Sequence, residues 1–299
     1  MKKLPLVFSG CLLGLAGAGN LIADTWPVLS HLFSLTGLVL WLFFLILHLF
    51  NWEETKKELT KPPLLSGMAT FPMAGMILST YVFRVFPHLP LVAQGLWWFS
   101  FLLDLALIAG FTIKFACPGR RVHATPSWTV LYVGIAVAAL TYPLVGIIEI
   151  AYATLSFGFL LTFYLYPLIY SDLKKYPLPQ ALLGQEGIYC APFSLLLASL
   201  VRVGGAGLPT WLLIVMILAS QSFFFFVLTR LPHILKRGFQ PAFSALTFPT
   251  IITATSLKMA QGILKLPFLD YLVLAETVIC LTILFFVLVG YLIWLRKKV

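Results

Sequence analysis

Residues 27–57 read PVLSHLFSLTGLVLWLFFLILHLFNWEETKK, an apolar run without Asp, Glu, Lys or Arg up to Phe50, followed by a loop that carries Lys56 and Lys57. A bilayer core about 30 Å thick requires about 20 apolar residues in a helix, so this run is long enough to cross it. The same alternation of apolar runs and basic loops recurs along the chain, whose 299 residues are 61% hydrophobic and only 10% charged. The sequence therefore predicts an all-α integral membrane protein.

Ten apolar stretches can be read outward from this one, between Pro5 and Leu295. They cover residues 5–23, 27–50, 67–85, 91–115, 126–147, 149–171, 186–202, 208–229, 241–258 and 268–295. Short connections join antiparallel neighbours, so we expect ten transmembrane helices arranged as five helical hairpins. Because no long stretch is left over, a single ten-helix domain covering residues 1–299 is expected.

Most Lys and Arg residues fall on one side of these stretches. Sixteen of the 20 lie there: Lys2, Lys3, Lys56, Lys57, Lys61, Lys114, Arg120, Arg121, Lys174, Lys175, Arg230, Lys236, Arg237, Arg296, Lys297 and Lys298. The other side holds only Arg84, Arg202, Lys258 and Lys265. Because cytoplasmic loops retain Lys and Arg, both termini are expected in the cytoplasm of a multi-pass protein of the cell (inner) membrane. The net charge of +10 then faces anionic lipid headgroups and does not indicate binding of nucleic acid.

The odd and even stretches differ in composition. The odd stretches combine small residues with a proline near their cytoplasmic third, at Pro5, Pro72, Pro126, Pro192 and Pro249. The even stretches are bulkier, which suits contact with lipid, whereas small residues suit close contact between helices. The pattern predicts five odd helices inside, around a central pore, and five even helices outside.

Internal prolines lack an amide proton and kink a helix. We therefore expect Pro72, Pro192 and Pro249 to leave the carbonyls of Met68, Ile188 and Ala245 without partners. Pro5 and Pro126 can instead occupy a first helical turn, where proline is harmless. Unpaired carbonyls are costly in lipid, which places the kinked helices inside the bundle or along a watery cavity.

The polar residues of the odd stretches indicate what would pass along such a pore. The odd stretches contain no Asp and no Glu except Glu186, at the start of the seventh. Anion pores use basic rings and neutral donors, whereas cation paths normally carry carboxylates. We therefore predict a path for small anions. The expected lining and kink residues are Thr70, Pro72, Pro126, Pro192, Ser194, Thr247, Pro249 and Thr250, and the expected basic outer mouth is Arg84, Arg202 and Lys258.

Two alternatives stay open for these side chains. The hydroxyls can bond to carbonyls of their own helices, and the basic residues can extend to the interface or pair with nearby acids. Asp104 is the one carboxylate deep in a stretch, and it is either a proton-coupling site or a structural group. With Glu149 and Glu186 as further titratable candidates, a proton-coupled exporter of dicarboxylate, sulfite or tellurite-type oxyanions is the main alternative function.

No motif points to an enzyme, a metal site or a cofactor. The four cysteines form no CxxC pair, and no HExxH, P-loop or GxSxG occurs. The five histidines are not placed to ligate a haem from one depth. A quinone- or haem-binding anchor subunit is a third hypothesis, and it would predict visible absorbance of the purified protein.

The most specific stretch of the chain runs from Arg230 to Ser256 and contains FSALTFP at residues 243–249. Supporting stretches are TPSW at 125–128, GIYCAP at 187–192 and the proline-initiated helix at 5–19. In these features the chain resembles the tellurite-resistance/dicarboxylate transporter (TDT) family, which includes TehA and the SLAC-like slow anion channels of plants. The resemblance covers essentially the full length.

The resemblance implies five helical hairpins around a pseudo-five-fold axis, with one pore in each protomer of a homotrimer. It also implies that a phenylalanine of the ninth helix closes the pore, and Phe248 stands at the matching position. A benzyl group across a narrow apolar constriction can block ions by dewetting it.

Overall fold

The computed structural model describes residues 4–117, 122–236 and 238–297, and within these ranges the chain is helical and contains no strand. The predicted all-helical fold is therefore confirmed for the described residues. Six of the basic residues used to assign the cytoplasmic side lie outside them: Lys2, Lys3, Arg120, Arg121, Arg237 and Lys298.

The even stretches form long helices. These are α2 (Pro27–Phe50), α6 (Pro90–Phe111), α9 (Ile148–Lys175), α11 (Thr210–Leu235) and α13 (Pro267–Lys297). A π-helical turn, η2 (Thr112–Ala116), extends α6, and a short helix, α3 (Trp52–Glu58), follows α2. Their apolar sequences contain few breaks, because residues that face lipid on one side need no close contact with a neighbouring backbone.

The odd stretches are interrupted. The first two consist of η1 (Leu6–Phe8) with α1 (Ser9–Leu21), and α4 (Pro62–Gly67) with α5 (Thr70–Val85). The third consists of α7 (Ser127–Val133), η3 (Gly134–Ala136), α8 (Val137–Thr141) and η4 (Tyr142–Leu144). The last two consist of η5 (Gln180–Cys190), α10 (Ala191–Gly204) and η6 (Gly205–Gly207), and of η7 (Pro241–Leu246) with α12 (Thr247–Leu264).

The prolines stand at the junctions of these interrupted segments. Pro72, Pro192 and Pro249 lie in the first turns of α5, α10 and α12, where a missing amide proton costs least. The carbonyl of Met68 accepts the N–H of Phe71, and the carbonyl of Ile188 accepts the N–H of Ala191. The expectation that these two carbonyls stay unpaired is therefore wrong, because tight 3₁₀ turns satisfy them.

Among the described residues, eight helical segments are long and apolar enough to cross a membrane. They are Pro27–Phe50, Pro62–Val85, Pro90–Ala116, Ser127–Leu144, Ile148–Lys175, Gln180–Gly207, Thr210–Leu235 and Pro267–Lys297. Leu6–Leu21 is apolar but shorter, and α12 is not among the eight. These criteria therefore support a multi-pass membrane protein, while the number of ten crossings stays a prediction.

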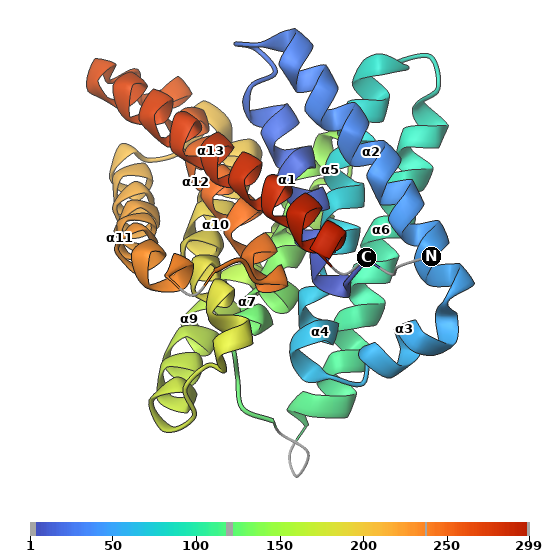
Figure 1. Cartoon of the computed structure of the whole chain (residues 1–299). Coiled ribbons are helices and arrows are strands. Elements are labelled where there is room, and N and C mark those ends of the chain that lie inside the picture. Colours follow the sequence, from blue (N-terminus) through green and yellow to red (C-terminus); the bar gives the residue numbers. More distant parts are fainter. Residues whose placement is uncertain (1–3, 118–121, 237, 298–299) are drawn as a thin grey trace.

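The interrupted segments lie inside the molecule. Segments α1, α5, α8, α10 and α12 contact one another in that cyclic order, and α12 returns to α1. In the most apolar part of the odd segments 62–85, 127–144 and 180–207, between 61% and 72% of the residues are buried, against 22% to 39% in the long helices. Figure 1 shows α2 and α6 on one flank of this inner ring, α9 and α11 on the opposite flank, and α13 across the front.

Contacts between inner segments, and between inner segments and the long outer helices, hold the bundle together. The Trp41 ring of α2 stacks on Phe71 of α5 at 4.5 Å between centroids, and its Nε1 donates to the Phe71 carbonyl at 2.9 Å. Ser66 of α4 donates to the Ser127 hydroxyl at 2.7 Å. Polar pairs of this kind satisfy groups that lipid could not.

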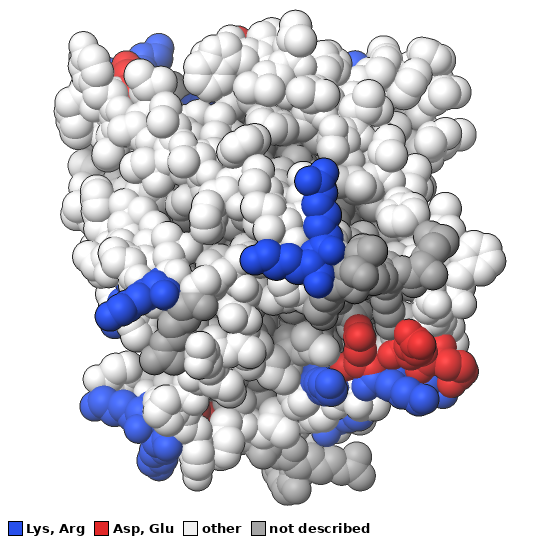
Figure 2. Space-filling model, viewed as in Figure 1, with Lys and Arg blue, Asp and Glu red and all other residues white. Residues whose placement is uncertain are grey.

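Charged side chains are sparse over most of the molecule. On the face shown in Figure 2, most of the surface is uncharged. Basic side chains lie at its centre and left side, and the largest group of acidic residues lies with basic ones at the lower right, in the region of α3. The helix α3 carries Glu53, Glu54, Lys56 and Lys57. Such a distribution is typical of a protein whose apolar belt faces hydrocarbon.

Candidate functional site

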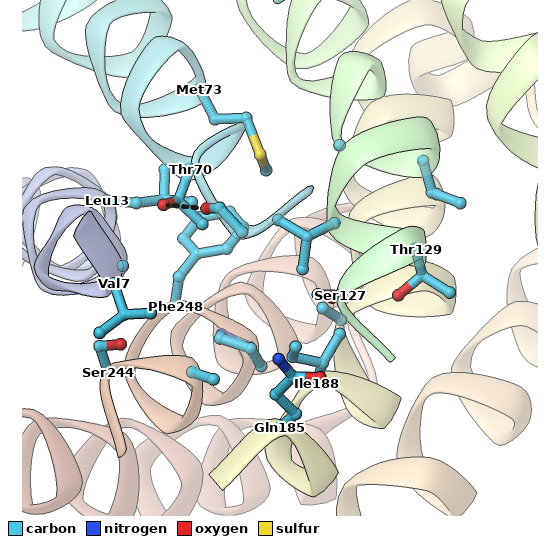
Figure 3. Close-up of a pocket in the computed structure, with 18 of the residues that line it drawn as sticks. Val7, Leu13, Thr70, Met73, Ser127, Thr129, Gln185, Ile188, Ser244 and Phe248 are labelled. Atoms are coloured by element: carbon cyan, nitrogen blue, oxygen red, sulfur yellow. Dashed lines mark hydrogen bonds between the residues drawn. The ribbon is translucent and has the colours of Figure 1, made fainter. Parts of the chain in front are cut away.

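A cavity opens on the side where the inner segments begin, and we call it the N-side cavity. All five odd stretches line it, the third through α7 and η3 and the others through α1, α5, α10 and α12 with parts of η1, α4, η5 and η7. The lining residues are Val7, Gly10, Leu13, Pro63, Gly67, Thr70, Met73, Ser127, Thr129, Val130, Val133, Gly134, Gln185, Ile188, Ala191, Pro192, Leu195, Ala242, Ser244, Ala245, Phe248 and Pro249 (Figure 3). None of these residues is charged.

Phe248 is the aromatic residue of the N-side cavity. Its side chain is 4% exposed and lines the cavity together with Leu13, Thr70 and Met73 (Figure 3). A Cβ atom on Gly17 of α1 would lie only 3.2 Å from Cδ2 of the Phe248 ring. The ring therefore crosses from α12 to α1, where the absence of a side chain on Gly17 leaves room for it.

A second cavity, of about 740 Å³, lies on the side where the inner segments end. We call it the C-side cavity. Its lining is Asn20, Leu21, Ala23, Asp24, Ile77, Thr80, Phe83, Arg84, Leu140, Thr141, Pro143, Leu144, Arg202, Thr255, Lys258, Met259 and Gly262. These residues come from the same five inner segments and their ends, so both cavities lie along the axis of the ring.

The layer between the cavities is thin. In α5 the nearest lining residues of the two cavities are Met73 and Ile77, and in α12 they are Pro249 and Thr255. At 1.5 Å per helical residue, these steps correspond to about 6 Å and about 9 Å along the axis. The intervening residues include Ala74, Ala138, Ala198 and Ala254, which are fully buried. Small side chains thus pack the inner segments together at this level.

The structure brings the three predicted mouth residues into one cavity. Arg84, Arg202 and Lys258 all line the C-side cavity, from α5, α10 and α12 respectively. Lys258 donates to the Leu21 carbonyl at 2.8 Å and lies 3.5 Å from the Asp24 carboxylate. Arg84 lies 3.5 Å from the Ser30 hydroxyl and 5.5 Å from the Tyr81 ring.

Arg202 differs from the other two cations. It is exposed in the cavity, and in the described part of the chain its guanidinium makes no hydrogen bond or ion pair. Asp24, which lines the same cavity, offsets one of the three positive charges, so the net charge of the lining is 3 − 1 = +2. A cavity with that charge concentrates anions.

The predicted lining residues divide into two groups. Thr70, Pro192 and Pro249 line the N-side cavity, whereas Pro72, Pro126, Ser194, Thr247 and Thr250 line neither described cavity. Ser194 shares hydrogen bonds with Ser220 and Thr253, and Thr247 donates towards the carbonyls of Gly10 and Ser244. Thr250 bonds to carbonyls of its own helix. The bonds of Thr250 within its own helix are the alternative considered for these hydroxyls, whereas the bonds of Ser194 and Thr247 to neighbouring segments were not expected.

The three titratable candidates lie away from both cavities. Asp104 is fully buried on α6, and neither of its oxygens has a hydrogen-bond partner among the described residues. Glu149 stands in the first turn of α9. Glu186 accepts two hydrogen bonds from Arg230, at 2.8 Å and 3.1 Å, and so links η5 to α11. None of the three lines the N-side or the C-side cavity.

Sequence reasoning missed four polar residues. Gln185 lines the N-side cavity, and Asn20 and Asp24 line the C-side cavity. Glu276 is 1% exposed on α13 and lines neither cavity. A signal for Gln185 is present in Gly184-Gln185-Glu186-Gly187, where two glycines flank polar residues and permit close backbone packing.

In residues 4–117, 122–236 and 238–297, no three side chains of His, Cys, Asp or Glu lie close enough together to hold a metal ion. The four cysteines are free thiols.

The chain matches the model of a known protein family. A family model described as "voltage-dependent anion channel" matches residues 3–292 of the chain. The search of curated proteins finds no match.

Proposed function

Because the chain belongs to the voltage-dependent anion channel family, we propose that it is an anion-selective channel or uniporter for small inorganic or carboxylate anions, and that Phe248 closes its pore. Family membership makes the chain a membrane protein of anion transport. One observation carries the more detailed proposal. The same five inner segments line two cavities on either side of a thin packed layer, and Phe248 lies at that layer.

Charge supports anions as the transported species. The C-side cavity has a net lining charge of 3 − 1 = +2, and the N-side cavity is lined by uncharged residues. An ion that enters past Arg202 therefore meets attraction first and a neutral path afterwards. Conduction requires binding that is favourable enough for entry and weak enough for release, and this sequence of environments provides both.

Phe248 is suited to closing such a path. Its phenyl ring is apolar and buried, and it packs against small residues of the inner helices that leave little other space. A constriction of this kind excludes ions because their hydration shells cannot enter it. Movement of one side chain would then connect the two cavities without rearrangement of the helices.

The alternative of a proton-coupled exporter has less support. Asp104, Glu149 and Glu186 are its candidate proton carriers, and none of them lines either cavity.

We propose further that the ten helical stretches form five hairpins in one domain of the cell membrane, with both termini in the cytoplasm. The family resemblance also favours a homotrimer with one pore in each protomer.

Currents from purified protein in planar bilayers test this function. We expect Phe248→Ala to carry larger currents than the parent protein, with a reversal potential that follows the anion gradient when chloride, nitrate or malate is exchanged. Phe225→Ala is the control, because it removes the same ring at an exposed position of α11 that lines neither cavity. Unchanged current from well-folded Phe248→Ala would refute the occluding role. Transport that stops when a pH gradient is dissipated would favour the exporter.

A further inference from the structure

Gln185 is a buried polar residue without a partner. Its side chain is 5% exposed and lines the N-side cavity. Its Oε1 is buried without a hydrogen-bond partner, and its Nε2 donates to no group in the described part of the chain. Buried side-chain amides normally find partners, because an unpaired one costs free energy. In Figure 3 its side chain extends from η5 into the cavity.

The packing around Gln185 holds it in this place. A Cβ atom on Gly184 would collide with the carbonyl of Ala242, so the backbones of η5 and η7 are in direct contact there. On the other side of Gln185, the Glu186 carboxylate is bound by Arg230. The residue between these two contacts has little freedom, and preorganised groups bind ligands at a lower entropic cost.

Several other donors around the N-side cavity are already used. The amide protons of Phe71, Ala191 and Thr247, at the starts of three inner helices, are donated to backbone carbonyls three residues earlier. The Thr70 and Thr129 hydroxyls donate to the carbonyls of Gly67 and Pro126. Anions entering this cavity must exchange hydration for protein donors, and the amide of Gln185 has two N–H groups to offer.

We propose that Gln185 binds the permeating anion in the N-side cavity by donating hydrogen bonds from Nε2, and thereby sets the affinity of this side of the pore. This proposal rests on the proposed function. It assigns a neutral amide to the uncharged cavity, in contrast to the cations of the C-side cavity. A neutral donor binds an anion less tightly than a guanidinium does, which favours release on this side.

The test uses Phe248→Ala as the conducting parent, with potassium nitrate or potassium chloride supplied on the N side. Gln185→Met keeps the length of the side chain and removes its donors. A hydrogen bond to a charged group contributes about 1.5–3 kcal/mol, so we expect the half-saturating anion concentration to rise about tenfold or more. Gln185→Glu places a negative charge in the cavity, and we expect the anion current to fall about tenfold and the selectivity over potassium to decrease.

The control is Gln221→Met in the same parent. Gln221 is also a buried glutamine, but it lies on α11, faces Glu276 of α13 and lines neither cavity. Its half-saturating concentration should stay within about twofold of the parent. Gln185→Met and Gln185→Glu are independent tests, so the proposal can be tested even if only one of the two variants folds. The proposal would be overturned if the half-saturating anion concentration of Gln185→Met and the anion current of Gln185→Glu both stayed within twofold of the parent. It would also be overturned if Gln221→Met had the same effect as Gln185→Met. A parent without anion-selective current would instead overturn the proposed function.

Discussion

Phe248 of α12 packs its ring onto Gly17 of α1. A Cβ atom on Gly17 would lie 3.2 Å from Cδ2 and 3.4 Å from Cε2 of that ring, and 3.1 Å from Cγ2 of Ile251. The two residues belong to the first and the ninth apolar stretches of the sequence, which are neighbours in the inner ring. A residue with any side chain at position 17 would compete with the ring for the same space. The glycine is therefore part of the proposed closing device.

This contact predicts coupling between the two positions. Gly17→Ala should lower the apparent melting temperature of the detergent-solubilised protein, because the Phe248 ring and Ile251 must both shift by a few tenths of an ångström. In the Phe248→Ala background the phenyl ring is absent, so Gly17→Ala should lower the melting temperature by less. A double-mutant cycle in denaturant or thermal unfolding should give a coupling free energy of about 0.5 kcal/mol or more. Additive effects of the two substitutions would contradict the contact.

Arg202 gives a prediction about ion entry. Arg202→Gln should reduce anion current at low ionic strength several-fold, because it removes the cavity cation that has no protein partner. The effect should fade near 1 M salt, where the Debye length falls to about 3 Å. Lys265→Gln is the matched control, since it removes one charge from the same side of the molecule at a residue that lines neither cavity. Equal losses for the two variants would indicate only a general surface-charge effect.

Much of the fold followed from the sequence for physical reasons. Apolar length predicts helices that cross a membrane, and the contrast between small and bulky stretches predicts which of them contact lipid. The odd stretches are indeed the buried ones. Arg84, Arg202 and Lys258 could be grouped because they lie near equivalent ends of inner stretches, and such ends meet around one axis. The family resemblance is confirmed by the match over residues 3–292.

Which side chains face the cavities could not be predicted, because this depends on helix rotations and on turns that a hydropathy pattern does not specify. A hydroxyl on an inner helix faces either the axis or a neighbouring helix, and a rotation of about 100° per residue separates the two cases. Thr70 faces the N-side cavity, whereas Ser194 faces Ser220 and Thr253. Gln185 was missed because it precedes the seventh apolar stretch, where a polar residue is expected in a loop. The 3₁₀ segment η5 instead carries it into the bundle.

The contact between η5 and η7 gives the last prediction. Gly184 touches the backbone of Ala242 so closely that a Cβ atom would collide with its carbonyl, and backbone cannot move aside as a side chain can. Gly184→Ala should therefore separate the two 3₁₀ segments that border the N-side cavity and destabilise the protein by about 1–3 kcal/mol. Gly95→Ala on α6 is the control, because no atom lies within 4 Å of a Cβ placed there and alanine favours a helix. Thermal unfolding of both variants in detergent measures the difference, and the current of Gly184→Ala should fall with its folded fraction. If Gly184→Ala proved as stable as Gly95→Ala, the two segments would not be in the contact described.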